Sequence, residues 1–229
     1  MARRRVGNPL ALGVLSCLLE RPMHPYEIST TLKERGKEQS IKLNYGSLYS
    51  VVDSLHKHGL IQAQETSRDG RRPERTVYAI TDDGRAEFED WLAELLSTPV
   101  REFTSLEAGL SLMPGLPPDQ VAALLETRAG RLRAEIDHIE AMHTAARGQG
   151  LHDLFLIESI YRVHMLTAEL DFVTRLGQDI GSGAMPGTKS WQRIHELRSD
   201  GVSMEEIFAD PVRYLGEEGR ALLPPDHAN

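Results

Sequence analysis

The sequence has 229 residues, enough for one large or two small domains. Its formal net charge of −8, taken by itself, argues against binding to nucleic acid. The charge is uneven, however: residues 1–80 hold 13 Lys and Arg against 8 Asp and Glu, whereas residues 81–229 hold 13 against 26, which is typical of a chain that meets nucleic acid at one end. The single cysteine, Cys17, excludes a disulfide framework, and no apolar segment has the length to span a bilayer, so we expect a cytoplasmic protein without a membrane partner.

Two short helices are predicted first. Asn8 and Pro9 form a helix start, because Asn is a good N-cap and Pro suits the first helical position. Pro22 ends this helix, since proline disfavours the helical conformation in the residue before it. A second helix is expected from Pro25 to about Lys37.

A third helix, residues 44–57, carries the strongest functional pattern. Asn44 is its candidate N-cap, and Gly59 can take the left-handed conformation after its last turn. Apolar residues recur at helical spacing on one face, and hydroxyl-bearing side chains are left on the others. Hydroxyls bind phosphates and base edges, so the pattern predicts a recognition helix; an ordinary amphipathic surface helix is the alternative. The apolar set is Leu48, Val51, Val52 and Leu55, and the polar set is Tyr45, Ser47, Tyr49, Ser50 and Asp53.

A β-hairpin is expected next, with strands over residues 60–66 and 74–80. Asp69-Gly70 between two alternating runs is a strong signal for a tight turn. The turn is basic, and three helices followed by a basic hairpin are the order of a winged helix-turn-helix. A solvated turn is the alternative role for these basic residues. They are Arg68, Arg71 and Arg72 at the tip, with Arg75 just beyond.

Several of these segments occur together in one known family. They include Gly-Ser-Leu-Tyr at residues 46–49, Gly-Arg-Arg-Pro at residues 70–73, and the stretches 18–28, 59–61 and 78–84. In order and spacing they resemble the PadR family of bacterial transcriptional regulators over about residues 8–98. Pro25 stands where the family usually has Gly, but proline is compatible with a helix start there.

The resemblance implies a homodimeric repressor of double-stranded operator DNA, usually relieved by a small molecule, with a C-terminal helical dimerisation region. The fold expected is therefore mainly α with a small β-hairpin: an N-terminal winged helix-turn-helix and a C-terminal antiparallel helical region. Two-fold symmetry would match an inverted-repeat operator. The expected DNA-binding residues are Lys42, Asn44, Tyr45, Ser47, Tyr49, Ser50, Arg68, Arg71, Arg72 and Arg75.

The second half is predicted to be helical. A fourth helix starts at Thr81 and ends before Pro99, and a short helix covers residues 103–113. A long helix from Pro117 carries an apolar seam spaced 3, 4, 3, 4, 3 from Ala122 to Ile139, typical of a coiled coil. Residues 151–176 form a helix that is apolar over much of its circumference. The expected dimerisation residues are Leu125, Leu132, Ile136, Ile139, Leu156, Ile160, Val163 and Leu170.

The domain boundaries follow from these elements. We expect a DNA-binding domain over residues 1–98, a helical dimerisation domain over 99–180, and a C-terminal tail over 181–229. In the tail, residues 177–188 are predicted to be a Gly-rich loop, followed by two short helices near 190–197 and 204–208. The tail exceeds what the shorter family members have, and packing on the dimer region is its expected role.

An effector site is predicted in the wedge between the fourth helix and the C-terminal helices, near Trp91, Phe103, Tyr161 and His164. Aromatic residues at helical spacing are more often core than pocket, and that is the alternative here.

Other classes of function have weaker support. Two Glu-x-x-His patterns, ending at His138 and His143, resemble di-iron ligands, but they lie five residues apart on one helix, about 140° around its axis, so they cannot close on one metal pair. No metal, cofactor or catalytic residue is expected, and an enzyme is not the prediction. The remaining alternative is a helical ligand- or protein-binding module whose winged helix contacts protein and not DNA.

Overall fold

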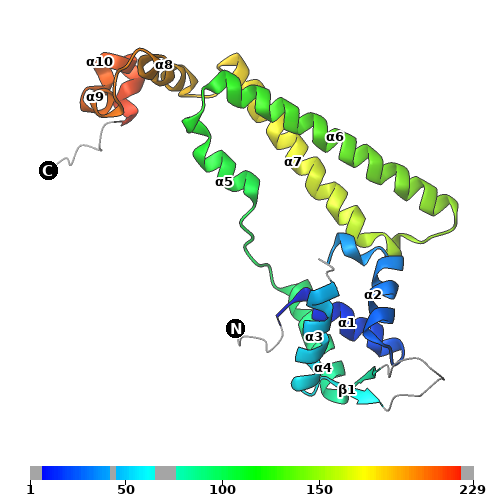
Figure 1. The fold of residues 1–229 in the computed structure, drawn as a ribbon. Coiled ribbons are helices and arrows are strands. Elements are labelled where there is room, and N and C mark those ends of the chain that lie inside the picture. Colours follow the sequence, from blue (N-terminus) through cyan, green and yellow to red (C-terminus); the bar gives the residue numbers. More distant parts are fainter. Residues whose placement is uncertain (1–6, 42–44, 65–75, 223–229) are drawn as a thin grey trace. The chain divides into compact units, whose positions relative to one another are not determined.

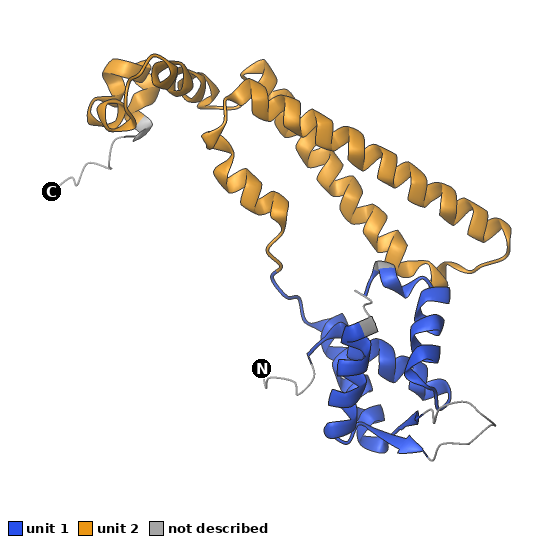
Figure 2. Ribbon diagram, in the orientation of Figure 1, with its two compact units in different colours: residues 1–101 blue, residues 102–229 orange. Residues whose placement is uncertain are grey.

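The computed structural model describes residues 7–41, 45–64 and 76–222, and the chain divides into two compact units, residues 1–101 and 102–229 (Figures 1 and 2). Helices dominate both, and a two-stranded antiparallel sheet lies in the first, so the predicted fold class is confirmed. The first unit contains α1 (Pro9–Glu20), α2 (Pro25–Glu34), η1 (Lys37–Gln39), α3 (Tyr45–Lys57), β1 (Ile61–Gln64), β2 (Val77–Ile80) and α4 (Asp82–Ser97).

The starts of α1 and α2 are fixed by side-chain caps. The Asn8 side chain accepts a hydrogen bond from the Leu10 N–H, and Pro9 occupies the first helical position as predicted. In α2 the cap is His24, and Glu27 accepts from the His24 N–H at 2.8 Å to complete a capping box. This helix ends at Glu34, three residues earlier than predicted, because Gly36 takes a left-handed conformation.

The hairpin and α4 are joined through Thr81. In the hairpin Ile61 pairs with Ile80 and Gln64 with Val77, and Met23 adds a bridge to Tyr78. Thr81 caps α4 by accepting from the Gly84 N–H, and its own hydroxyl donates to the Gly59 carbonyl at 2.7 Å. The end of α3, the strand β1 and the start of α4 are thereby held together.

One hydrophobic core closes the first unit. It takes side chains from α1, α2, α3, the hairpin and α4, including Leu15, Ile28, Leu55, Ile61 and Trp91. All five are at most 5% exposed. Cys17 belongs to the same core, and burial raises the pKa of its thiol, as expected for a structural cysteine.

The second unit is built on two long helices that lie side by side, α6 and α7 (Figure 1). They run antiparallel, since Arg128 pairs with Glu169, Glu135 with Arg162, and the His143 ring with Ser159. The elements of this unit are α5 (Ser105–Leu112), η2 (Met113–Gly115), α6 (Pro118–Gly148), η3 (Asp153–Phe155), α7 (Ile157–Ser182), α8 (Thr188–Ser199), α9 (Met204–Ala209), α10 (Pro211–Leu215) and η4 (Gly216–Leu222).

The prediction of a loop from residue 177 was wrong. Helix α7 continues through Gly177 and Gly181 and stops at Gly183, which has φ +72°. Gly177 lies against α6, where an added Cβ would be 3.4 Å from that of Leu125. Glycine therefore serves here for close packing of two helices and does not break one. The elements α10 and η4 were not predicted either.

Candidate nucleic-acid interface

Helix α3 divides into a buried and an open face. Leu48, Val52 and Leu55 are at most 1% exposed and pack in the core of the first unit. On the other faces Tyr49 is 46% exposed, and Ser50 is exposed as well. The core thus fixes the helix in its rotation and leaves phenol and hydroxyl groups outward, as a recognition helix requires.

Three serines on α3 line a shallow hollow beside the start of α1. Ser47, Ser50 and Ser54 follow one another at helical spacing, and Asn8 completes the lining. The Ser50 hydroxyl donates to the Gly46 carbonyl at 3.0 Å, so it remains available to an outside group as an acceptor. Ser54 and Asn8 were not predicted as site residues. The serine repeat at i, i+3 and i+7 could have indicated Ser54.

The C-terminal end of α3 is tied to the hairpin by His56. Its Nδ1 lies 3.1 Å from the Ile61 carbonyl, and its ring meets that of Tyr78 edge-on at 5.7 Å. Burial, with a smaller contribution from Asp53, raises the pKa of the Tyr78 hydroxyl, so this residue stays neutral at physiological pH. The contacts hold the strands on the helix, and the wing segment begins where these strands end.

Two arginines of this unit are paired with carboxylates. Arg35 holds Glu20 through two hydrogen bonds of 2.5 and 2.8 Å, and this contact lowers the pKa of Glu20. Arg21 lies 3.5 Å from Glu27. Because their charges are already balanced, Arg21 and Arg35 are poorer candidates for phosphate contact than basic residues without acidic neighbours.

Part of the predicted interface lies outside the described residues. This holds for Lys42 and Asn44 before α3 and for the wing residues Arg68, Arg71, Arg72 and Arg75. Tyr45 is the first residue of α3. The DNA-binding role of all these residues stays a prediction.

The four residues predicted to surround an effector belong to two units. Trp91 is buried in the core of the first unit. In the second unit Phe103 is 81% and Tyr161 is 66% exposed. His164 is exposed and lines a hollow between α6 and α7, with its Nδ1 3.1 Å from the Ile160 carbonyl. Trp91 thus has a structural role in the first core, and the effector role of the four residues stays a prediction.

The predicted dimerisation residues form a seam inside one chain. Leu125, Leu132, Ile136 and Ile139 of α6 are at most 8% exposed because α7 covers them. The other four predicted residues are half-buried: Ile160, Val163 and Leu170 of α7, and Leu156 just before it. Their own chain therefore occupies much of the seam, and a contact between copies through these residues stays a prediction.

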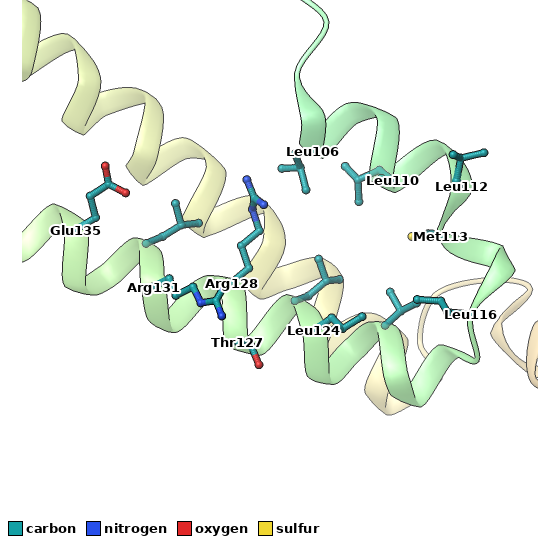
Figure 3. A pocket seen from close by; sticks show the side chains of 14 residues that line it. Leu106, Leu110, Leu112, Met113, Leu116, Leu124, Thr127, Arg128, Arg131 and Glu135 are labelled. Carbon is teal, nitrogen blue, oxygen red and sulfur yellow. The ribbon is translucent and has the colours of Figure 1, made fainter. Parts of the chain in front are cut away.

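An open groove lies between α5 and α6 in the second unit, with a volume of about 660 Å³ (Figure 3). Leu106 and Leu110 point from α5 toward α6, where Leu124 forms part of the opposite wall. Polar groups lie farther along α6, among them Arg128 and Glu135.

Among the described residues no group of three or more His, Cys, Asp and Glu could hold a metal ion. No described helix is long and apolar enough to cross a bilayer.

Comparison with known proteins bears on both units. Residues 14–90 match the model of the transcriptional regulator PadR-like family. Curated proteins give no match to the sequence. Among solved structures, Bacillus subtilis PadR in complex with operator DNA is 18% identical, with a TM-score of 0.56 over 76% of this chain and 99% of that one.

Two further solved structures are similar over the same share of the chain. The PadR-like regulator BC1756 from Bacillus cereus is 16% identical, with a TM-score of 0.50 over 76% of this chain and 98% of that one. The Vibrio cholerae virulence activator AphA is 15% identical, with a TM-score of 0.50 over 76% and 97%. At this identity the likeness establishes a shared fold, including the winged helix, and it leaves the residues of the interface to the chain itself.

Proposed function

We propose that this chain, which carries a PadR-like transcriptional regulator domain over residues 14–90, is a homodimeric repressor of inverted-repeat operator DNA whose affinity is changed by a small-molecule effector. The observation that carries the proposal is α3, a helix fixed by its buried face with phenol and hydroxyl groups on its open face. The protein of Bacillus subtilis named above has also been solved with p-coumaric acid, which supports an aromatic acid as the first effector class to try.

The DNA contact divides into reading and holding. Ser47 and Tyr49 would enter the major groove with α3 and reach base edges, which sets specificity. Arg71 and Arg72, with Arg68 and Arg75, would hold the wing on phosphates, which adds affinity without sequence preference. The paired Arg35 would contribute to neither.

A second copy would cover the exposed apolar face of α7, part of which lines an open hollow with Leu106 and Leu110 of α5. Along this helix Ile157, Tyr161, Met165, Ala168 and Phe172 recur at intervals of three or four residues and share one face. Four of them are large side chains between 47% and 66% exposed. The neighbouring charged residues of α7, Arg162 and Glu169, form ion pairs with α6. An apolar stripe of this length is typical of a helix that packs on another helix.

The α7 stripe would form only part of a dimer interface. A stable interface needs about 800 Å² from each partner, and the half-exposed stripe supplies less than this by itself, because a whole aromatic side chain offers about 150–250 Å². Other exposed apolar side chains of the second unit, such as the 75% exposed Leu112 of α5, would have to contribute the rest. In a two-fold pair of antiparallel α7 helices the middle of the stripe, near Met165, would face itself.

DNA reading is tested by fluorescence anisotropy with the duplex upstream of the chain's own gene, against random DNA, over a series of salt concentrations. We expect Arg72→Ala to weaken binding to both duplexes and to lower the slope of log K against log salt by about one. Ser47→Ala should instead reduce the discrimination between the duplexes. Arg35→Ala is the matched control, since its charge is already paired, and its slope should stay at the wild-type value. Absence of binding even at low salt would contradict the proposal and favour a protein-interaction module.

The dimer surface is tested by a cysteine at its centre. A disulfide requires Cα atoms within about 7 Å of each other. In the proposed dimer the two copies of residue 165 face each other, so Met165→Cys should form a disulfide-linked dimer under mild oxidation. The natural Cys17 is buried and should stay silent. His138→Cys, exposed on α6, is the matched control. Equal cross-linking of both variants, or a monomeric wild type at micromolar concentration, would contradict this surface.

A further inference from the structure

The C-terminal helices α8, α9, α10 and η4 pack into a small body of their own. Its interior holds Leu197, Ile207 and Pro211, of which Ile207 is fully buried. Gly219 lies so close to α10 that an added Cβ would meet the Pro211 carbonyl oxygen at 2.2 Å. These contacts bring the end of the described chain back onto α10.

Helix α8 is also fixed at its start. The Glu218 carboxylate accepts from the Ser190 N–H at 3.3 Å and from the Ser190 hydroxyl at 2.6 Å. Ser190 lies in the first turn of α8, where backbone N–H groups need partners and negative charge is favourable. A residue 28 positions later in the sequence therefore caps this helix, so α8 is held in place by the rest of the tail.

Two side chains of α8 reach the turn that joins α5 to α6. The Trp191 indole N–H donates to the Leu116 carbonyl at 2.9 Å, and the His195 Nε2–H donates to the Pro114 carbonyl at the same distance. The Trp191 ring also packs against the core between α6 and α7. Both acceptors belong to the turn formed by η2 and Leu116, which we call the α5–α6 elbow (residues 113–116).

The elbow matters because α5 has little other support. None of the eight residues of α5 is fully buried, and Leu106 is its one residue packed against the core between α6 and α7, so few contacts besides the elbow fix its direction. Residues 98–104 precede α5 and connect it to the DNA-binding unit. The direction of α5 relative to α6 thus depends largely on the elbow.

We propose that the C-terminal helices are a latch on the α5–α6 elbow: Trp191 and His195 hold it in one conformation, and their release lets α5 move independently of α6. The latch, like the elbow, lies within the second unit. Its effect on the elbow is independent of any ligand. Its effect on operator affinity rests on the proposed function, because a change at the elbow can affect DNA binding only if α5 passes it on to the DNA-binding unit.

Hydrogen–deuterium exchange of the full-length protein tests the latch without DNA. Trp191→Phe keeps an aromatic ring but loses the donor, and His195→Ala loses the other donor. Each should speed exchange in residues 104–117 by roughly fivefold, the factor that a typical hydrogen bond contributes. His195→Gln, whose amide N–H can still donate, should restore slow exchange. Arg193→Ala is the matched control on the same helix, since Arg193 pairs with Glu196 and not with the elbow.

The exchange of α8 itself decides how a change is interpreted. If residues 104–117 exchange faster while α8 keeps its protection, the latch is supported. If α8 loses protection and residues 104–117 do not change, or if neither segment changes in the Trp191→Phe and His195→Ala variants, the latch is overturned.

Operator binding is the second arm. The protein with both Trp191→Phe and His195→Ala should bind the operator several-fold more weakly than wild type, and its binding to random DNA should be unchanged. A loosened elbow with unaltered operator affinity would overturn the transmission to the DNA-binding unit. A wild-type protein that binds no DNA would contradict the proposed function, while the exchange result would still decide whether the latch exists.

Discussion

The two units differ in how much of its apolar surface each buries within itself. In the first unit α1 buries seven of its twelve residues, and all its helices and both strands contribute to one core. In the second unit α7 buries two of its twenty-six residues and α5 none of its eight. A unit that covers its apolar side chains can fold alone, whereas one that leaves them exposed requires further contacts. The first unit therefore covers its apolar side chains within one chain, whereas the second leaves apolar surface that a second copy would cover in the proposed dimer.

The largest effect is expected from Gly84→Ala, which disrupts the packing of α4 on the hairpin in the first unit. An added Cβ would lie 2.0 Å from the Leu60 carbonyl oxygen and 2.9 Å from the Ile80 side chain, so α4 would have to move off the hairpin. We expect a loss of about 3 kcal/mol in the free energy of unfolding, as for severe overpacking. Urea denaturation followed by circular dichroism measures it. A loss below about 0.5 kcal/mol would show that α4 tolerates displacement.

Ser159→Ala should have the next largest effect, this time inside the second unit. The Ser159 hydroxyl is the partner of the buried His143 ring, at 2.5 Å, and removing it leaves that ring nitrogen without the contact. We expect a loss of about 1–2 kcal/mol. Thr144→Ala is the control, because its hydroxyl bonds only to the backbone of its own helix on an exposed face. Equal losses in both variants would mean that the buried contact is not special.

A gain is expected from Gly130→Ala in α6. No atom lies within 4 Å of an added Cβ, and φ is helical there, so the change removes only the poor helix propensity of glycine. Stability should rise by about 0.5–1 kcal/mol, measured by the same denaturation. The pair Gly84→Ala and Gly130→Ala thus compares a packed and an open helical glycine, one in each unit. A loss at position 130 would indicate that a partner chain packs closely against it.

The smallest effect concerns the surface pair Glu20–Arg35 and its pH dependence. The hydrogen bond from Arg35 lowers the pKa of Glu20, so the pair stabilises the native state above the ordinary glutamate pKa. This contribution is lost as pH falls through the lowered native pKa. Because both side chains are exposed, it should be at most about 0.5 kcal/mol. Glu20→Gln should remove the acid-side slope of stability that the pair causes, and an unchanged slope would assign it to other carboxylates.

Local signals in the sequence were sufficient for the starts of the helices and for the hairpin strands of the first unit, but not for the end of α2 or for η1. Asn8, Pro9 and Thr81 act as the starts that their residue types indicate, and the apolar spacing in α3 identifies the buried face. These features depend on neighbours within a few residues, which the sequence contains directly. The hydroxyl face of α3 followed from the same spacing, although Ser54 and Asn8 were missed.

The second unit could be predicted less well, because its features depend on distant partners. The seam containing Leu125 and Ile139 has the period of a coiled coil, but periodicity does not say whether the partner helix belongs to the same chain. The glycines from residue 177 predict a loop, whereas Gly177 lies inside α7 and its lack of a side chain allows close packing on α6. The bonds from Trp191 and His195 to the elbow join residues 75 and 81 positions apart, and no local pattern indicates them.

The most direct test of the account is a titration of the wild-type chain with two duplexes, one carrying the whole inverted repeat found by footprinting upstream of its own gene and one carrying a single half-site. We expect two chains on the whole repeat, bound at least tenfold more tightly than the half-site, and near-equal weak binding of both duplexes after Tyr161→Asp on the α7 stripe. Wild-type binding of one chain per duplex, with the same affinity for the half-site as for the repeat, would contradict a DNA reader completed by a second copy.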